Sequence, residues 1–193
     1  MENNLKSNLR KNMLIKRKNM SQQDVWDNSN KIIDKIMKLP KFIGCNNIML
    51  YLSFNNEVDT SNLATWCLNN CKTVIAPYCI NSSSKIIPFI INNLDTDLTK
   101  SSFGVMEPKH DILIKANIEN IDLIIVPGVV FDENCNRIGF GAGYYDRFLS
   151  LKSKNTPTIG IAYDYQIIDK VPTGVYDVPL DFIITEKRIL SVK

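Results

Sequence analysis

Histidine is nearly absent from this chain of 193 residues, which contains only His110. A catalytic triad or a multi-histidine metal centre therefore has little to work with, and we interpret His110 as a solvated loop residue. The 5 cysteines are odd in number and form no C-x-x-C pair, which argues against a disulfide framework and a zinc knuckle. Cys67 and Cys71, four residues apart on one helix face, are expected to be buried thiols that pack as small hydrophobic groups.

Long apolar runs and a large net charge are also missing. No stretch approaches the roughly 18 uncharged residues of a membrane span, and the basic N-terminus has no apolar signal segment. The formal charge is only +3, from 23 Lys and Arg against 20 Asp and Glu. We therefore expect a cytoplasmic protein that acts as a monomer, on a small molecule, without a nucleic-acid or membrane partner.

The composition that remains is typical of a globular protein, with 45% hydrophobic and 22% charged residues. A chain of this length buries roughly 70% of its unfolded surface, so it needs no metal or disulfide to complete a core. We expect one domain over residues 1–193.

Short apolar runs alternate with amphipathic segments along most of the chain. This alternation predicts an α/β fold: a three-layer, Rossmann-like, mostly parallel sheet with helices on both faces. The expected helices cover 4–19, a segment from Ser21 to before Pro40, 61–70 and a segment from Tyr144, and Thr60 is expected to cap the third of them. The expected strands cover 47–53, 73–76, 85–91, 122–126, 157–162 and 181–185. The strand 85–91 is expected near an edge of the sheet, because Pro88 cannot donate a ladder hydrogen bond. Ligands of such folds bind beyond the carboxyl ends of strands. The segments 54–60, 77–79, 128–145 and 163–166 are therefore candidate binding loops.

A glycine run in the third of these segments is the strongest chemical signal. Gly139, Gly141 and Gly143 alternate just before a predicted helix, where exposed backbone N–H groups suit a phosphate. The run is neither a Walker loop nor a dinucleotide fingerprint, because Tyr144 stands where the latter requires its third glycine. A plain flexible turn explains the same residues about as well.

Asp146 follows the glycines in the first turn of that helix. A carboxylate there repels a bound phosphate unless a divalent cation bridges the two, so Asp146 is a candidate Mg²⁺ ligand. It could equally cap the helix or pair with Arg147 or Arg137.

Three further features have both a functional and a structural interpretation. Tyr144 and Tyr145 offer ring faces for a flat heterocycle, or are buried under the loop. Glu57 follows the first strand and suits the N–C–NH₂ edge of a pterin, or is a surface acid. The third feature is Lys6 and Arg10, which lie one turn apart on the first helix. They are two aligned cations that could bind an anion, or they form a solvated basic face.

The run from Pro127 to Leu149 resembles the signature of the 5-formyltetrahydrofolate cyclo-ligase (methenyltetrahydrofolate synthetase) family. Further matches follow in the same order: Lys6-x-x-Leu9-Arg10, Tyr51 before Glu57-Val58-Asp59-Thr60, Gly104 to Glu107-Pro108, and Gly160-Ile161-Ala162-Tyr163 with Gln166. The resemblance covers nearly the whole chain. It implies a NagB/RpiA-like fold and an ATP- and Mg²⁺-dependent ligase that converts 5-formyltetrahydrofolate to 5,10-methenyltetrahydrofolate, releasing ADP and phosphate.

The resemblance also implies roles for individual residues. ATP would contact Lys6, Arg10, Arg137, Gly139, Phe140, Gly141, Ala142, Gly143, Tyr144 and Tyr145. The folate would contact Leu52, Glu57, Phe140, Gly141, Ala142, Gly143 and Tyr144. Mg²⁺ would be held by Asp146 and Asp181. No catalytic residue is expected, because the formyl oxygen attacks the γ-phosphate without a protein nucleophile, and catalysis then depends on alignment and charge neutralisation.

The glycine loop departs from the family pattern in one respect. Many relatives place a basic residue inside this loop, whereas the variable positions here are Phe140 and Ala142. The alternative to an enzyme is a non-catalytic nucleotide- or folate-binding protein that retains the pocket. A nucleotide-sugar or dinucleotide enzyme and a nucleic-acid role for the first helix are weaker alternatives.

Overall fold

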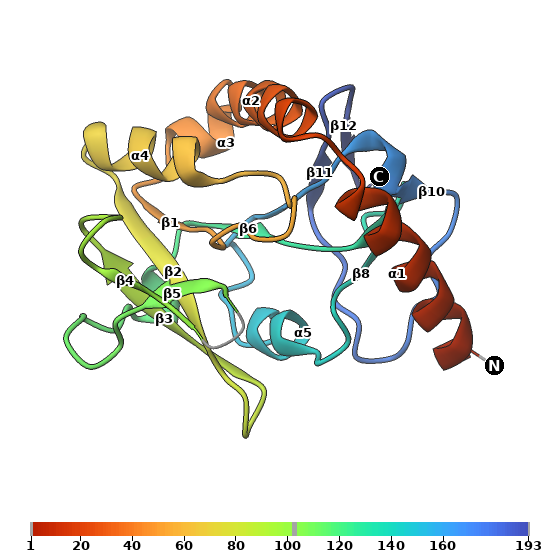
Figure 1. The fold of residues 1–193 in the computed structure, drawn as a ribbon. Coiled ribbons are helices and arrows are strands. Elements are labelled where there is room, and N and C mark those ends of the chain that lie inside the picture. Colours follow the sequence, from red (N-terminus) through yellow and green to blue (C-terminus); the bar gives the residue numbers. More distant parts are fainter. Residues whose placement is uncertain (1, 102–103, 193) are drawn as a thin grey trace.

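The large sheet contains seven strands: β1 (Asn47–Met49), β2 (Thr73–Ile80), β3 (Lys85–Ile91), β6 (Leu123–Val126), β9 (Thr158–Ile161), β11 (Phe182–Ile184) and β12 (Ile189–Ser191). In the computed structural model, which describes residues 2–101 and 104–192, they lie in the order β12-β11-β9-β6-β1-β2-β3 (Figure 1). The five central strands are parallel, and only β3 and β12 pair antiparallel at the edges. The predicted mostly parallel sheet and the edge position of Pro88 are confirmed.

Helices cover both faces of this sheet (Figure 1). One face carries α2 (Gln22–Met37), α3 (Pro40–Ile43) and α4 (Ser61–Asn69), and the other carries α5 (Tyr144–Leu149). Ile32 and Ile36 of α2 pack with Ile48 and Leu123 of the sheet in the first core cluster, and all four side chains are fully buried. The continuous apolar strands are therefore explained by burial on both sides.

Two local predictions around α4 are wrong. Thr60 precedes α4 but makes no side-chain cap, because its buried hydroxyl donates to the Tyr51 carbonyl at 2.6 Å. Cys71 is exposed because α4 ends at Asn69, so it does not share a helix face with the buried Cys67. Ser21 caps α2, since its hydroxyl oxygen accepts the Asp24 N–H at 3.0 Å.

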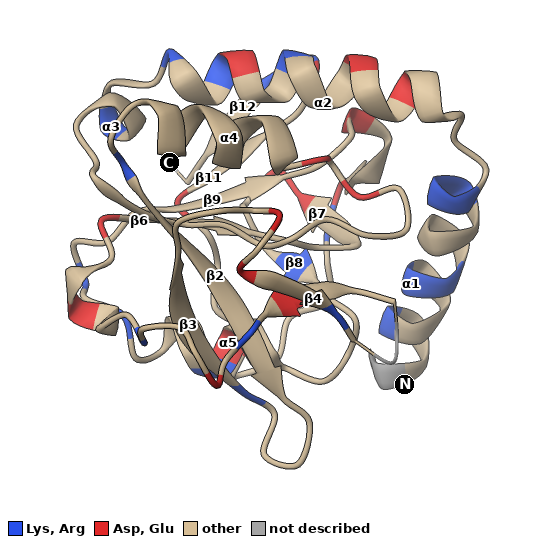
Figure 2. Cartoon of the chain, turned by 60° about the vertical axis from the view of Figure 1, so that its left-hand side comes forward, with Lys and Arg blue, Asp and Glu red and all other residues tan. Residues whose placement is uncertain are grey.

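Helix α1 (Glu2–Lys18) lies beside the carboxyl ends of the parallel strands and carries several basic residues (Figures 1 and 2). It packs on a small second sheet of β7 (Val130–Asp132), β8 (Arg137–Ile138) and β10 (Ile167–Ile168). Met13 joins Val130 and Ile138 in a core cluster that fixes this contact. Sequence patterning did not predict this sheet.

The remaining elements are the hairpin of β4 (Leu98–Lys100) and β5 (Met106–Pro108) and two short 3₁₀ helices, η1 (Ile118–Asn120) and η2 (Asp164–Gln166). Within the described ranges, no helix has the length and apolarity required to cross a membrane.

Candidate functional site

A cavity of about 1020 Å³ opens where the parallel strands end. Its walls come from α1, from the segment after β1, from the end of β2, from the β4–β5 hairpin and from the glycine run with the start of α5. Three of the four candidate binding loops contribute, namely 54–60, 77–79 and 128–145. The fourth, 163–166, does not line the cavity.

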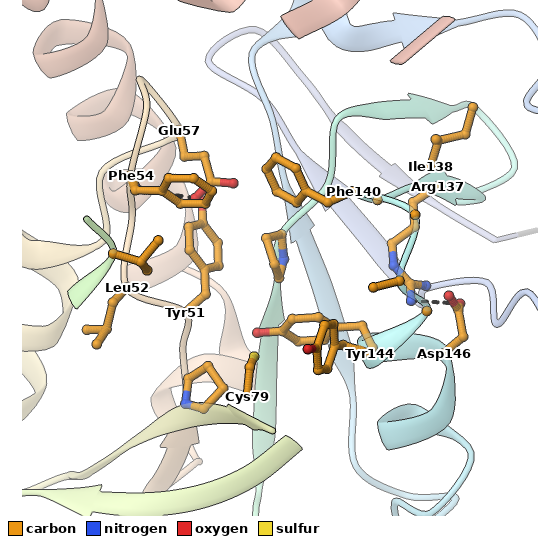
Figure 3. Close-up of a pocket in the computed structure, with 18 of the residues that line it drawn as sticks. Tyr51, Leu52, Phe54, Glu57, Cys79, Arg137, Ile138, Phe140, Tyr144 and Asp146 are labelled. Carbon is orange, nitrogen blue, oxygen red and sulfur yellow. Dashed lines mark hydrogen bonds and ion pairs between the residues drawn. The ribbon is translucent and has the colours of Figure 1, made fainter. Parts of the chain in front are cut away.

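Glu57 lies at one end of the cavity beside Tyr51, Leu52 and Phe54 (Figure 3). It is only 5% exposed, so its interpretation as a surface acid is wrong. Its carboxylate accepts the Phe54 N–H at 3.3 Å and lies 3.5 Å from the guanidinium of the buried Arg17. Burial raises the pKa of Glu57 to about 7, against the opposing effect of Arg17.

The glycine run forms the wall that faces Glu57. Gly141 and Gly143 have φ values of 107° and 66°, which side-chain-bearing residues rarely adopt. A Cβ at Gly141 would lie only 3.3 Å from the Arg10 guanidinium, so the glycine also allows this close approach. Between the glycines, the Phe140 ring points toward Phe54, with ring centroids 5.4 Å apart (Figure 3).

Lys6 and Arg10 of α1 both line the cavity, so the interpretation of this pair as a solvated basic face is wrong. Arg10 Nε donates to the Gly139 carbonyl at 2.7 Å, which ties the first helix to the glycine run. Lys6 Nζ lies 2.5 Å from the Asp177 carboxylate. Both cations line the cavity, and Asp177, the partner of Lys6, lies near Arg137, across the cavity from Glu57 (Figure 3).

Arg137 and Asp146 form a second ion pair at that end, at 2.8 Å (Figure 3). Arg137 Nη1 also donates to the Val178 carbonyl, and the Val178 N–H donates to Asp146. Burial lowers the pKa of Arg137, and Asp146 opposes that shift. The structure thus shows Asp146 in one of its alternative roles, as the partner of Arg137, while keeping it on the cavity wall.

Asp177, and not Asp181, shares the cavity with Asp146. Asp181 lies at the amino-terminal ends of β9 and β11, where its carboxylate accepts the N–H and hydroxyl of Thr158, each at 2.8 Å. The predicted convergence of Asp146 and Asp181 on one metal is therefore wrong. Asp177 and Asp181 both occur in the segment Tyr-Asp-Val-Pro-Leu-Asp, and nothing in that local pattern distinguishes the two.

Asp177 has the electrostatic character of an anion held among cations. Although burial opposes the shift, the Lys6 ammonium and the Gly174 N–H lower its pKa. Arg137 acts in the same direction, which places its charge near both Asp177 and Asp146. Two carboxylates and two cations thus alternate at this end of the cavity.

The two tyrosines of α5 differ in their contacts. The Tyr144 hydroxyl donates to the Asn81 side chain at 2.8 Å. The Tyr145 hydroxyl is buried and has no hydrogen-bond partner among residues 2–101 and 104–192. Burial raises the pKa of Tyr145, with Glu57 acting in the same direction and Arg137 against it. Tyr145 is thus a residue of the cavity wall whose buried hydroxyl has no partner among the described residues.

Arg147 does not line the cavity but supports the glycine run through contacts that sequence reasoning missed. Its guanidinium donates to the carbonyls of Ala142 and Ser84, and it lies 3.2 Å from where a Cβ of Gly143 would be. It thereby connects the glycine run to the turn between β2 and β3. The spacing of four residues indicates only that Arg147 lies near Gly143; the bonds to Ala142 and Ser84 depend on the loop conformation.

His110 differs partly from its prediction as a solvated loop residue. Its side chain is 43% exposed, but its ring stacks on Tyr78 of the cavity wall, with centroids 4.2 Å apart.

Comparison with known proteins gives one consistent family. The family model described as the 5-formyltetrahydrofolate cyclo-ligase family matches residues 2–186. The 5-formyltetrahydrofolate cyclo-ligase of Haemophilus influenzae is 30% identical over 175 residues, covering 89% of each chain. The Escherichia coli K12 protein of the same name is 29% identical over 156 residues, covering 80% of this chain and 86% of its own.

Two solved structures share the fold. The NMR structure of Aquifex aeolicus 5,10-methenyltetrahydrofolate synthetase has a TM-score of 0.85 and 34% identity, and the match covers 98% of this chain and 93% of that one. The 5,10-methenyltetrahydrofolate synthetase of Mycoplasma pneumoniae has a TM-score of 0.76 and 29% identity, with coverages of 94% and 98%.

Proposed function

This chain belongs to the 5-formyltetrahydrofolate cyclo-ligase family, and we propose that its cavity converts 5-formyltetrahydrofolate to 5,10-methenyltetrahydrofolate while ATP is cleaved to ADP and phosphate. One observation carries the proposal. A single cavity of about 1020 Å³ has a buried carboxylate at one end and two cation–carboxylate pairs at the other. The first suits a pterin edge and the second a magnesium polyphosphate.

The phosphate end would hold ATP through Lys6, Arg10 and Arg137, with backbone N–H groups of the glycine run. Phe140 and Ala142 bring no charge, so neutralisation of the phosphates would depend on these three cations and the metal. Phe140 would cover the bound ligands from the same loop.

Mg²⁺ fits the donors at this end of the cavity. The described residues contain no group of three or more His, Cys, Asp or Glu placed to hold a metal. Mg²⁺ needs only one or two carboxylates when phosphate oxygens and water complete its shell, and Asp146 and Asp177 supply two. When bound, Mg²⁺ would neutralise phosphate charge. Lys6 and Arg137, released from their carboxylate partners, would then be free to contact the phosphates.

The folate end would place the pterin against Glu57 and Leu52, between Phe54 and the glycine run. An ionised Glu57 accepts two hydrogen bonds from an N–C–NH₂ edge, and its burial strengthens both. Tyr145 also lines the cavity, and its unpartnered hydroxyl would be available to the bound substrates only if the side chain turned toward them.

The reaction needs no protein nucleophile. The formyl oxygen attacks the γ-phosphorus and ADP leaves; the neighbouring folate nitrogen then attacks the formyl carbon, loses its proton and expels phosphate with that oxygen. The residues named above would align the two substrates and neutralise the developing charge, which is the main source of rate in phosphoryl transfer.

The decisive experiment is turnover by the purified protein. ATP, Mg²⁺ and 5-formyltetrahydrofolate should together produce the near-ultraviolet absorbance of the methenyl product, and omitting ATP should abolish it. Folded protein that binds both substrates without forming this chromophore would favour the alternative, a non-catalytic nucleotide- or folate-binding protein.

The proposal extends to the fold assignment, the domain count and the cellular state of the whole chain. The order of the parallel strands supports a NagB/RpiA-like assignment for the sheet. Cavity residues from Lys6 to Asp177 support treating residues 1–193 as one functional domain. The cysteine usage supports a cytoplasmic location, and a monomer is proposed without further support.

A further inference from the structure

Arg17 is a buried cation that packs against the wall of the cavity at the folate end, outside the cavity itself. It lies in the last turn of α1 and is 2% exposed. Lys6, Arg10, Met13 and Arg17 follow one another at steps of three or four residues, so they share one face of the helix. The first two reach the phosphate end, Met13 enters the core, and Arg17 ends beside Glu57 without lining the cavity itself.

Arg17 contacts both walls of the cavity. Its Nη1 lies 3.5 Å from Glu57 Oε1, on the wall formed by the segment after β1. Its guanidinium carbon lies 5.5 Å from the centroid of the Phe140 ring, on the glycine run. The Phe140 ring also contacts Phe54, whose N–H bonds the second oxygen of Glu57 (Figure 3).

The backbone around Glu57 is docked on the end of α1. Asn56, which has a positive φ of 57°, donates from its side chain to the carbonyls of Arg17 and Met20, at 3.1 and 3.2 Å. On the other side, the Tyr163 hydroxyl donates to the Glu57 carbonyl at 3.0 Å. These bonds hold the Glu57 backbone independently of the Arg17 charge, so substituting the Arg17 side chain leaves them in place.

We propose that Arg17 is a positioning residue for the cyclo-ligase reaction: its guanidinium keeps the Glu57 carboxylate ionised and aimed at the pterin, and its contact with Phe140 joins that carboxylate to the glycine run. The proposal rests on the proposed function, because it assigns the pterin to Glu57.

The charges around Glu57 support this role. Arg17 of α1, Tyr51 after β1 and Tyr145 of α5 are the titratable groups that interact with Glu57, and Arg17 alone among these three is a cation. Burial already raises the pKa of Glu57 to about 7 while Arg17 acts against it. Without that cation the carboxyl would be protonated at neutral pH, and its O–H would face pterin donors.

The test compares Arg17→Met and Arg17→Lys with the wild type and with Lys18→Met, which removes an exposed cation from the next position of the same helix. Binding of 5-formyltetrahydrofolate to each protein is titrated without ATP from pH 6 to pH 9, and ATP binding is titrated separately. For Arg17→Met we expect about tenfold weaker folate binding at pH 7. The midpoint, meaning the pH at which folate affinity falls to half of its maximum, should rise by about one pH unit or more. ATP affinity should stay within about threefold of the wild type, a margin of less than 0.7 kcal/mol.

Arg17→Lys should restore most of the midpoint, because it keeps the charge, and Lys18→Met should match the wild type. An Arg17→Met midpoint equal to that of the wild type overturns the proposal, as does equal loss of both ligands. If Arg17→Met does not fold, Arg17→Gln, which also removes the charge but keeps a polar side chain, takes its place: a raised midpoint supports the role, and the wild-type midpoint overturns it. Wild-type turnover with an unshifted Arg17→Met midpoint rejects only Arg17, whereas a wild type that neither binds nor converts folate rejects the proposed function as well.

Discussion

Substituting Asp177 and Asp181 separately by Asn distinguishes a ligand-binding carboxylate from a structural one. The two residues are four positions apart in one segment, and each substitution removes one negative charge with little change of size. Asp177 lies on the cavity wall beside Lys6, whereas Asp181 bonds Thr158 at the other ends of the strands. We expect Asp177→Asn to affect ligand binding and Asp181→Asn to affect stability.

The magnitudes follow from these contacts. Asp181 accepts two hydrogen bonds of 2.8 Å from Thr158, and hydrogen bonds to a charged group contribute about 1.5 to 3 kcal/mol. At about 2 to 4 °C per kcal/mol for a chain of this size, Asp181→Asn should lower Tm by roughly 3 to 12 °C. The Lys6–Asp177 pair is partly exposed, at 21% and 26%, so Asp177→Asn should cost less than about 1 kcal/mol of stability.

The effect of Asp177→Asn on ATP affinity should depend on whether Mg²⁺ is present. Loss of a ligand charge should weaken binding of Mg²⁺-ATP to Asp177→Asn by about 10- to 100-fold, or roughly 1.4 to 2.8 kcal/mol. Binding of ATP in the presence of a chelator should be unchanged or tighter, because one carboxylate that repels phosphate is gone. Asp181→Asn should bind Mg²⁺-ATP as the wild type does.

Calorimetric titration of each variant measures its ATP affinity with and without Mg²⁺, and thermal unfolding measures its Tm. The reasoning would be refuted by an Asp181→Asn protein that loses Mg²⁺-dependent ATP binding at an unchanged Tm. It would also be refuted by an Asp177→Asn protein that binds Mg²⁺-ATP normally.

Three further predictions concern the two ends of the cavity. Glu57 has a pKa of about 7, so its ionised fraction falls from about 90% at pH 8 to about 10% at pH 6; folate affinity should fall about tenfold over this range in titrations of the free protein, and a flat profile would contradict this. Arg10→Ala should weaken ATP about 10- to 150-fold through the loss of a charge-assisted contact while folate binding stays constant, and equal loss of both ligands would separate Arg10 from the phosphate site. Gly141→Ala should reduce ATP affinity more than Ala142→Ser does, because only Gly141 has a φ of 107° and contacts Arg10; equal effects of the two substitutions in the same titration would show that backbone conformation is unimportant there.

Local sequence patterns were sufficient for the elements whose burial repeats along the chain. The run from Leu123 to Val126 is fully buried as a central strand, and apolar residues of this kind show that burial without any partner being known. Strand ends were less accurate: the predicted strand 47–53 ends at Met49, and the predicted strand 73–76 continues to Ile80. Both differences arise where pairing with a neighbouring strand, and not residue type, decides the end.

The glycine run shows the same division within the site. Its alternation before a helix predicted the loop, and the structure adds the positive φ angles that only glycine adopts readily. The sequence also indicated that the loop lacks a cation. It did not indicate that Arg147 would fold back onto Ala142, because that contact depends on the loop conformation.

The sequence by itself determined the α/β class and the glycine run, because both are expressed in short-range spacing. The family resemblance, which extends along nearly the whole chain, then implied about half of the residues that line the cavity. Only the tertiary structure decided which charges meet. Lys6 pairs with Asp177 across 171 residues, and Arg10 bonds Gly139 across 129. Arg17 likewise reaches Glu57 across 40 residues. Such pairs form when packing brings separate elements together, so no local pattern could select Asp177 over Asp181 or distinguish the buried Arg17 from the other cations of its helix.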